Sequence, residues 1–345
     1  MQINFPEAMK KALGPSFLCT LVLSAAVSAR AQSVEDVHIV PPSVTAAGPP
    51  VLLPDMAPAD ASGSIFVHTK PFRVHIDLVL VPVTVTDAMQ RPVMSLAKGD
   101  FSLYEDEKPQ EIRYFSAEPE PISVAVLLDV SNSMTDKLEA ERAAVREFLQ
   151  NADPKDEYFA IAFSNRPRLV ASATQSIDEL EEKLTAIEPG GPTAMLDAIY
   201  LAQSQLRSAR YKRRAILLIT DGGDNASRFT MREIKNLMQE SDVQIYAIGL
   251  FETFFFNTLE EKMGKRWLRE ITDPTGGRTV TVDSRLKLPE TAAEISREMR
   301  NEYVLGYQRT AGVPNRWRKI RVEVNSSEAE HPLRTSYKRG YLTSE

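Results

Sequence analysis

Cysteine is nearly absent from the chain, and its scarcity removes several classes of function. The 345 residues contain one cysteine, Cys19, in an amino-terminal apolar segment that we expect to be removed. The mature chain would then have no disulfide, no cysteine-based metal cluster and no cysteine nucleophile. Its stability must come from the hydrophobic core.

The chain also lacks a strong charge and a long hydrophobic run. Its formal net charge is −6, with 26% charged and 43% hydrophobic residues, which is ordinary for a globular protein. This balance gives no electrostatic argument for binding nucleic acid or an anionic membrane surface. We interpret the basic stretch Arg210–Arg214 as a solvated helix end and loop, with a partner patch as the alternative.

The first 31 residues have the layout of a secretory signal peptide. Two lysines precede the apolar segment 12–26, and Ala29–Ala31 forms a small-x-small cleavage site. We therefore predict export to the periplasm, the cell envelope or the exterior, without a transmembrane helix in the mature chain, since the run is short for a bilayer. A lipid anchor on Cys19 is the alternative, which the bulky Leu18 disfavours.

Composition divides the remaining chain into four parts. Residues 32–69 are rich in proline and predict a disordered linker. Residues 70–117 predict an amino-terminal β module, 118–302 a central α/β domain, and 303–345 a carboxy-terminal β segment. Because each β flank has too few strands for a core of its own, we predict that the two pack together as a small antiparallel sandwich.

In the flanks, apolar residues recur at every second position, which is typical of strands. Apolar residues at 74, 76, 78 and 80 predict a strand that continues through Val85. Further strands are predicted at 101–105 and 112–115, on either side of a turn at Asp106–Pro109, and at 303–307, 319–324 and through the tail to Tyr341.

In the central part, apolar strands alternate with amphipathic helices. Strands are predicted at 122–128, 158–163, 215–220, 243–250 and 278–282, and helices at 137–150, 177–187, 194–206, 230–240 and 290–300. This alternation predicts an α/β fold with a doubly wound, mostly parallel sheet and helices on both faces. The crossover connections should be right-handed.

Side chains that carry oxygen atoms come directly after two of these strands and in one loop. Asp129, Ser131 and Ser133 come after the first strand, Asp221 comes after the third, and Thr193 follows two glycines. A doubly wound sheet brings such loops to one edge, where ligands bind. Two carboxylates and three hydroxyls suit a hard divalent cation such as magnesium. The sequence therefore predicts a cation site.

Simpler interpretations exist for each piece alone. Residues 129–133 alone would serve as a helix N-cap, and Asp221 with its glycines as a turn. We interpret Asp197 as a carboxylate at a helix amino terminus, and Asp224 and Asn225 as turn formers. We expect the aromatic run 251–256 (FETFFF) to belong to the core or a packed loop, with an exposed partner surface as the alternative.

The combined pattern resembles the metal-ion-dependent adhesion site (MIDAS) of von Willebrand factor type A (VWA) domains. The resemblance implies that Ser131 and Ser133 are direct metal ligands, that Thr193 binds directly or through water, and that Asp129 and Asp221 act largely through waters. It further implies Mg²⁺ as the cofactor, with Mn²⁺ or Ca²⁺ as alternatives. The open coordination position would take an acidic residue of a protein partner.

This resemblance covers about residues 120–302, and the flanks extend it. Asp100-Phe101, Glu105-Asp106, Tyr303–Tyr307 and Trp317–Ile320 are similar to segments of the exported VWFA-related Acidobacterial domain proteins. That group is defined by sequence, so it implies no particular ligand.

The composition of the α/β part favours binding over catalysis. All four histidines, at positions 38, 68, 75 and 331, lie outside it, and it has neither a Gly-x-Ser-x-Gly elbow nor a phosphate-binding glycine loop. We therefore predict no enzyme but an exported, metal-dependent protein-binding module for adhesion or interaction. The alternatives are a metal-dependent hydrolase and a structural envelope protein with an unused metal site.

Overall fold

The computed structural model describes residues 78–251, 259–309, 315–325 and 333–343. The predicted signal peptide and linker, Cys19 and all four histidines lie outside these residues. So does most of the aromatic run, although Phe251 itself is described and buried, as expected for a core position.

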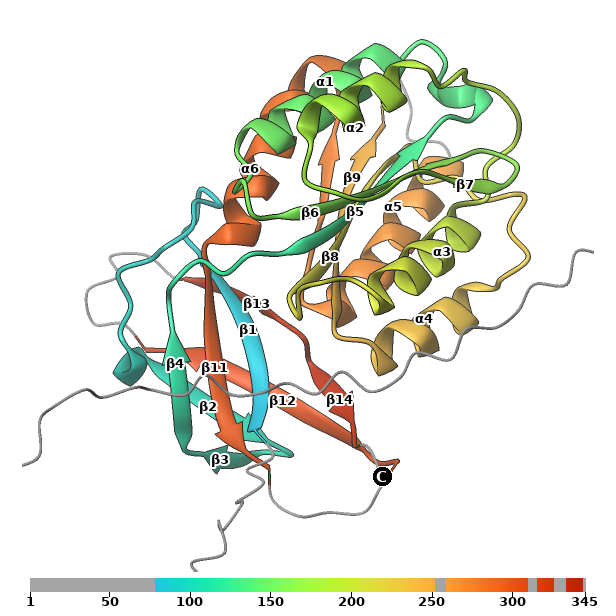
Figure 1. The fold of residues 1–345 in the computed structure, drawn as a ribbon. Helices are drawn as coiled ribbons and strands as arrows, with labels where there is room; N and C mark the ends of the chain where they lie inside the picture. Colours follow the sequence, from blue (N-terminus) through green and yellow to red (C-terminus); the bar gives the residue numbers. More distant parts are fainter. Residues whose placement is uncertain (1–77, 252–258, 310–314, 326–332, 344–345) are drawn as a thin grey trace, which may run out of the picture. The chain divides into compact units, whose positions relative to one another are not determined.

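A six-stranded sheet forms the centre of the α/β part (Figure 1). Its strands are β5 (Ser123–Asp129), β6 (Glu157–Phe163), β7 (Pro167–Thr174), β8 (Arg214–Thr220), β9 (Val243–Leu250) and β10 (Thr279–Val282). Their order is β10-β9-β8-β5-β6-β7, and all pairs are parallel except β6 with β7. The predicted doubly wound, mostly parallel α/β fold is thus confirmed.

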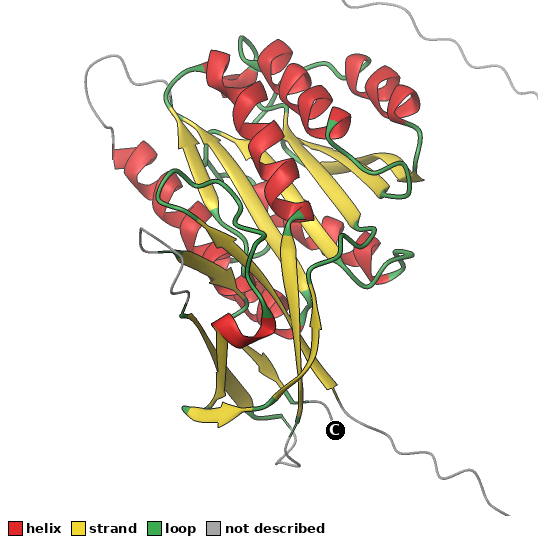
Figure 2. Cartoon of the chain, turned by 90° about the vertical axis from the view of Figure 1, so that its left-hand side faces the viewer, coloured by secondary structure: helices red, strands yellow, loops and turns green. Residues whose placement is uncertain are grey.

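Six α-helices among the described residues cover the two faces of this sheet (Figure 2). They are α1 (Leu138–Gln150), α2 (Ile177–Thr185), α3 (Met195–Arg207), α4 (Met231–Glu240), α5 (Leu259–Thr272) and α6 (Leu288–Arg300). Side chains from α1, α2 and α6 share one apolar cluster with the sheet, and side chains from α3, α4 and α5 share the other. In β5, Val126 faces the first cluster and Leu127 the second, because successive strand residues point to opposite faces.

Two four-stranded antiparallel sheets are built from the flanks of the α/β part. Their strands are β1 (Leu78–Thr86), β2 (Phe101–Glu105), β3 (Lys108–Gln110), β4 (Ile112–Ser116), β11 (Glu302–Gln308), β12 (Trp317–Val324), β13 (Arg334–Tyr337) and β14 (Gly340–Leu342). The strand orders are β13-β1-β11-β4 and β14-β12-β2-β3, so each sheet joins strands from before and after the α/β part. Side chains from both sheets form one core.

Strand β1 lies where the alternation predicted a strand, and its buried apolar residues are at odd positions. Among the apolar residues at even positions that predicted the strand, Leu80 is 50% exposed, whereas Val81, Val83 and Val85 are buried. Thr84, at an even position, is buried because its hydroxyl donates to Glu302 across the pair with β11. Leu78 and Leu80 instead lie over Gly306 on the outer face.

Three elements were missing from the sequence prediction: β3, β7 and α5. The turn before β3 is shorter than predicted, because Glu105 already pairs with Lys108. The two residues between them, Asp106 and Glu107, both have positive φ. Helix α5 contains Gly264, which weakened its helical pattern. A Cβ on Gly222 would lie 2.9 Å from the Cα of Gly264, so this close backbone approach requires glycine.

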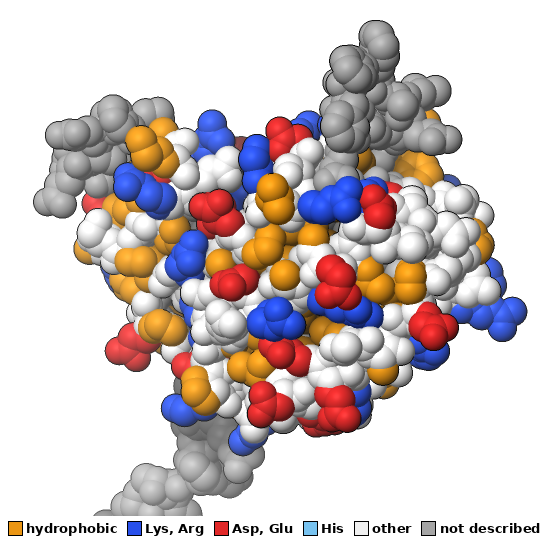
Figure 3. Space-filling view, turned by 90° about the horizontal axis from the view of Figure 1, so that it is seen from above, with side chains coloured by type: hydrophobic (Ala, Val, Ile, Leu, Met, Phe, Trp, Pro, Cys, Tyr) orange, Lys and Arg blue, Asp and Glu red, His pale blue; other side chains and the backbone are white. Residues whose placement is uncertain are grey.

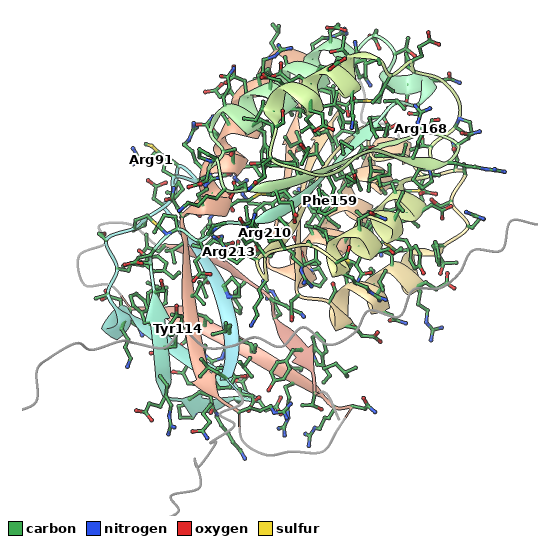
Figure 4. The ribbon with its side chains drawn as sticks, in the orientation of Figure 1. Arg91, Tyr114, Phe159, Arg168, Arg210 and Arg213 are labelled. Atoms are coloured by element: carbon green, nitrogen blue, oxygen red, sulfur yellow. The ribbon has the colours of Figure 1, made fainter. Side chains whose placement is uncertain are left out.

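In the basic stretch before β8, Arg210 and Lys212 are exposed in the loop after α3, as predicted, but Arg213 is not solvated. The side chain of Arg213 is only 10% exposed and forms an ion pair at 2.7 Å with the buried Glu302. It also donates to the carbonyl oxygens of Glu120 at 2.8 Å and Met299 at 2.6 Å. Figure 4 labels Arg213 at the amino-terminal end of β8, close to β11. Its role is therefore structural.

Candidate metal centre

The carboxyl ends of β5 and β8 lie side by side in the middle of the sheet. Here the strand order reverses, because the chain leaves β5 toward β6 on one side and leaves β8 toward β9 on the other. This switch point is where open α/β sheets form ligand crevices. Asp129 is the last residue of β5, and Asp221 follows the last residue of β8.

The first loop holds Asp129 and the two serines close together. The Oδ1 of Asp129 accepts the backbone N–H of Ser131 at 3.0 Å, and its Oδ2 accepts the hydroxyl of Thr220 at 2.6 Å. The Oγ atoms of Ser131 and Ser133 are 3.2 Å apart. Asp129 and Ser131 are buried. The carboxylate is thus fixed by two donors and the serine hydroxyls converge.

The second loop is tied to the first by backbone hydrogen bonds. Gly191 donates to the Oδ1 of Asn132 at 2.9 Å and accepts the backbone N–H of Asn132 at 3.0 Å. Gly190 donates to the carbonyl of Val130 at 2.7 Å. Gly191 has φ of +94°, a conformation that favours glycine. The loop that presents Thr193 therefore depends on its glycines.

The third loop, which carries Asp221, is hydrogen-bonded to Thr193 of the second loop. The backbone N–H of Thr193 donates to the Oδ1 of Asn225 at 2.8 Å, and its carbonyl accepts the N–H of Asn225 at 2.9 Å. Asp221 lies 3.6 Å from the ammonium of Lys137, measured between Oδ2 and Nζ. The five predicted site residues therefore stand on three linked loops.

These residues suit a small, hard divalent cation. Adjacent ligands of an octahedral magnesium ion are about 3 Å apart, because each oxygen lies at about 2.0–2.1 Å from the metal. The separation of 3.2 Å between the Ser131 and Ser133 hydroxyls matches this value. Among the described residues no group of three or more His, Cys, Asp or Glu could hold a metal ion. A cation here would therefore need the hydroxyls as well as the two carboxylates.

Buried negative charge gives the site a reason to attract a cation. Burial raises the pKa of Asp129 to about 6, partly opposed by hydrogen bonds from Ser131 and Thr220 and increased by the charge of Asp221. Burial and the neighbouring Asp129 raise the pKa of Glu141 well above its ordinary value. The Oε1 of Glu141 accepts the backbone N–H of Asp129 at 3.0 Å, whereas its Oε2 has no hydrogen-bond partner among the described residues.

Sequence reasoning missed two charged residues at this edge, Lys137 just before α1 and Glu141 within it. A signal for Glu141 was present, because it is three residues after Leu138 and four before Val145, on the apolar face of the helix. A glutamate at such a position needs a polar neighbour, which here is the backbone of Asp129.

Asp224 and Asn225 do more than form a turn, which corrects our interpretation. Asp224 accepts the N–H of Leu196 at 2.9 Å, and Asn225 positions Thr193. Asp197 lies in the first turn of α3, as expected, and its Oδ1 accepts the N–H of Arg228 at 2.9 Å. These side chains join the third loop to the start of α3.

Removing the Asn225 side chain should weaken metal binding without unfolding the protein. In Asn225→Ala the N–H of Thr193 loses its acceptor, so the Thr193 hydroxyl is less well placed. Groups that orient metal ligands typically change affinity by about 10–100-fold when removed. Calorimetric titration with MgCl₂ would measure this loss, and Asn236→Ala on the exposed face of α4 is the matched control. Unchanged affinity in Asn225→Ala would contradict the role of the third loop.

Parts of this chain are similar to known proteins. Residues 124–223 match the family model described as the von Willebrand factor type A domain. An uncharacterized protein of Borreliella burgdorferi is 25% identical over 177 residues, which cover 45% of this chain and 52% of that protein. Inter-alpha-trypsin inhibitor heavy chain H4 of Homo sapiens is 27% identical over 153 residues, which cover 40% of this chain and 16% of that protein.

The chain thus spans about half or less of the length of these curated relatives. Among solved structures, "von Willebrand factor type A from Catenulispora acidiphila" is 14% identical with a TM-score of 0.46, and the match covers 78% of this chain and 74% of that one. The matched residues 124–223 contain β8, all of β5 except Ser123, and all five candidate site residues. The α/β part of this chain is a von Willebrand factor type A domain.

Proposed function

We propose that this protein is an exported binding module that uses a divalent cation to take an acidic side chain of a partner protein. The observation that supports the proposal is the hydrogen bonding between the three loops that carry Asp129, Ser131, Ser133, Thr193 and Asp221. VWA domains are generally interaction modules, which supports binding as the activity.

Each site residue has a separate task in this proposal. Ser131 and Ser133 would bind the cation directly, and Thr193 directly or through water. Asp129 would act mainly through water, because its two oxygens already accept hydrogen bonds from Ser131 and Thr220. When bound, Mg²⁺, or Mn²⁺ or Ca²⁺ in its place, supplies a coordination position for an incoming carboxylate oxygen. The hydroxyl ligands are neutral, so they leave the positive charge available to that carboxylate.

The signal-peptide pattern of the first 31 residues supports export of this module. In the described part of the chain, no helix combines the length and hydropathy needed to cross a membrane. Basic and acidic side chains are interspersed on the face seen from above, without a large field of one sign (Figure 3). We propose the periplasm, the cell envelope or the exterior as the location. The domain boundaries after residues 31, 69, 117 and 302 and the likeness to the Acidobacterial group stay predictions.

A metal-dependent pulldown from envelope extract tests the function. Immobilised mature protein should retain a partner in MgCl₂ and release it in EDTA, and Asp129→Ala should retain none. The control Asp178→Ala removes an exposed carboxylate on α2 and should behave as wild type.

Two other outcomes would refute the proposal. Turnover of phosphate or peptide substrates that disappears in Ser131→Ala would show a metal-dependent hydrolase. A protein that binds no divalent cation would be a structural component with an unused site.

A further inference from the structure

A lysine side chain lies at the edge of the candidate metal centre, beside Asp221. The Nζ of Lys137 is 3.6 Å from the Oδ2 of Asp221, and the two side chains are only 14% and 18% exposed. A mostly buried ammonium next to a site carboxylate is a second positive charge in a place that would hold a divalent cation. At this depth solvent screens the charge less than it would on an open surface.

The structure holds Lys137 in this place from several sides. It is the residue before α1, where its N–H donates to Met134 at 2.9 Å and its carbonyl accepts the N–H of Glu141 at 3.0 Å. The preceding residue, Asp136, is bound by Arg285 through its carbonyl oxygen at 2.6 Å and its carboxylate at 3.0 Å. The backbone is therefore anchored, and the ammonium is directed to the site edge rather than to open solvent.

Lys137, just before α1, and Glu141, in its first turn, lie on the same side at the metal centre. They are four residues apart, so both lie on the side of the helix that faces the end of β5. Glu141 contacts the backbone of Asp129, and Lys137 contacts the carboxylate of Asp221. The two aspartates of the site thus have different neighbours. Glu141 lies beside Asp129, and the negative charge of Asp221 is partly balanced by the positive charge of Lys137.

We propose that Lys137 is a built-in counter-cation of the metal centre and that its charge sets the metal affinity. This inference rests on the proposed function. The ammonium competes with a divalent cation for the negative charge of Asp221 and repels the cation through space. Metal loading is therefore weaker than the five oxygen ligands alone would give, so occupancy follows the free divalent ion concentration around the exported protein.

The sign of the effect follows from charge. Removing Lys137 takes away one positive charge and leaves the carboxylates unchanged, so the site becomes more negative. The repulsion scales with the double charge of the metal, whereas an ion pair that is partly solvated contributes little to holding Asp221 in place. The uncharged variant should bind Mg²⁺ with a dissociation constant lower by about tenfold.

Calorimetric titration of MgCl₂ into the full mature chain tests this inference. Lys137→Met keeps the length of the apolar stem and removes the charge, and Lys137→Gln is a second uncharged variant. Both should bind Mg²⁺ about tenfold more tightly than wild type. Lys137→Arg keeps the charge and should stay close to wild type. The control Lys183→Met removes a surface charge that pairs with Glu179 on α2, and it should not change the affinity.

The outcomes separate this inference from the proposed function. If wild type binds no divalent cation, the proposed function fails. If wild type binds Mg²⁺ but both uncharged variants bind it equally or more weakly, Lys137 is not a counter-cation although the function stands. Tighter binding in Lys137→Arg as well would also overturn the inference, because the effect would then not come from charge.

Discussion

Exchanging Asp129 for asparagine is expected to abolish Mg²⁺ binding while leaving the fold intact. The carboxamide has nearly the same shape and can still accept the N–H of Ser131, so the loop should keep its conformation. It lacks the negative charge that a divalent cation needs at this position. Saturation at one hundred times the dissociation constant stabilises a fold by about 2.7 kcal/mol, and the variant should lose this gain completely.

The same variant should have an altered pH dependence when a chelator removes metal. The pKa of Asp129 is raised to about 6 in the folded protein, from 3.8 in the unfolded chain, chiefly by burial. Because this pKa is raised, the stability that protonated Asp129 contributes to the fold is fully present below pH 3.8. It is lost as the pH rises through about 6. This difference corresponds to roughly 3 kcal/mol at neutral pH, so Asp129→Asn should be more stable than wild type there by up to that amount.

Urea unfolding between pH 4 and pH 8, with EDTA and with MgCl₂, measures both effects of Asp129→Asn. Burial raises the pKa of Glu141 in both proteins, and Asp129→Asn removes the further increase that comes from the Asp129 charge, so the comparison reports the two neighbouring carboxyl groups together. Magnesium stabilising the two proteins equally would show that Asp129 is not part of the metal centre.

Replacing Arg213 with methionine is expected to destabilise the fold by about 3–5 kcal/mol. The side chain of Glu302 is 1% exposed, and its Oε2 pairs with Arg213 at 2.7 Å. Its Oε1 accepts from Gln244 at 2.8 Å and from Tyr246 at 3.3 Å. Without Arg213 the carboxylate would keep a buried charge with no cation beside it. Urea denaturation monitored by circular dichroism would give the change in the free energy of unfolding.

Two further variants show whether the buried charge causes this loss. Combining Arg213→Met with Glu302→Gln removes both charges and should recover a large part of the stability, because a neutral amide is easier to bury than an unpaired carboxylate. Arg146→Met breaks an exposed ion pair with Glu181 and should cost about 0–1 kcal/mol. If Arg213→Met also falls in that range, the pair is not an important support of the fold.

The α/β fold was predictable because most of its strands are continuous apolar runs. β5, β8 and β9 are buried along their whole length, apart from the partly exposed Arg214 at the start of β8. Their apolar runs alone therefore predict buried strands. β7 was missed because it is an antiparallel edge strand in which Ala171 and Thr174 are the buried positions. The sequence predicted β1 as a strand but not which face it buries, because contacts with distant residues, such as Thr84 with Glu302, decide this.

The candidate site was predictable in its residues but not in its surroundings. Asp129 and Asp221 come directly after predicted strands, so the sequence predicted both at the carboxyl edge of the sheet. Lys137 and Glu141 belong to a helix whose sequence says nothing of which strand end it faces. The role of Arg213 likewise depends on Glu302, which is 89 residues away. Pairing of buried charges is a property of the packed structure, so local patterns do not reveal it.

Calorimetric titration of MgCl₂ into the purified mature protein at pH 7 tests the central claim most directly. We expect saturable binding of one divalent cation per chain, with loss of the signal in Asp129→Asn and a similar isotherm for MnCl₂. The absence of binding by the wild-type protein for both metals would contradict a metal centre built from Asp129, Ser131, Ser133, Thr193 and Asp221.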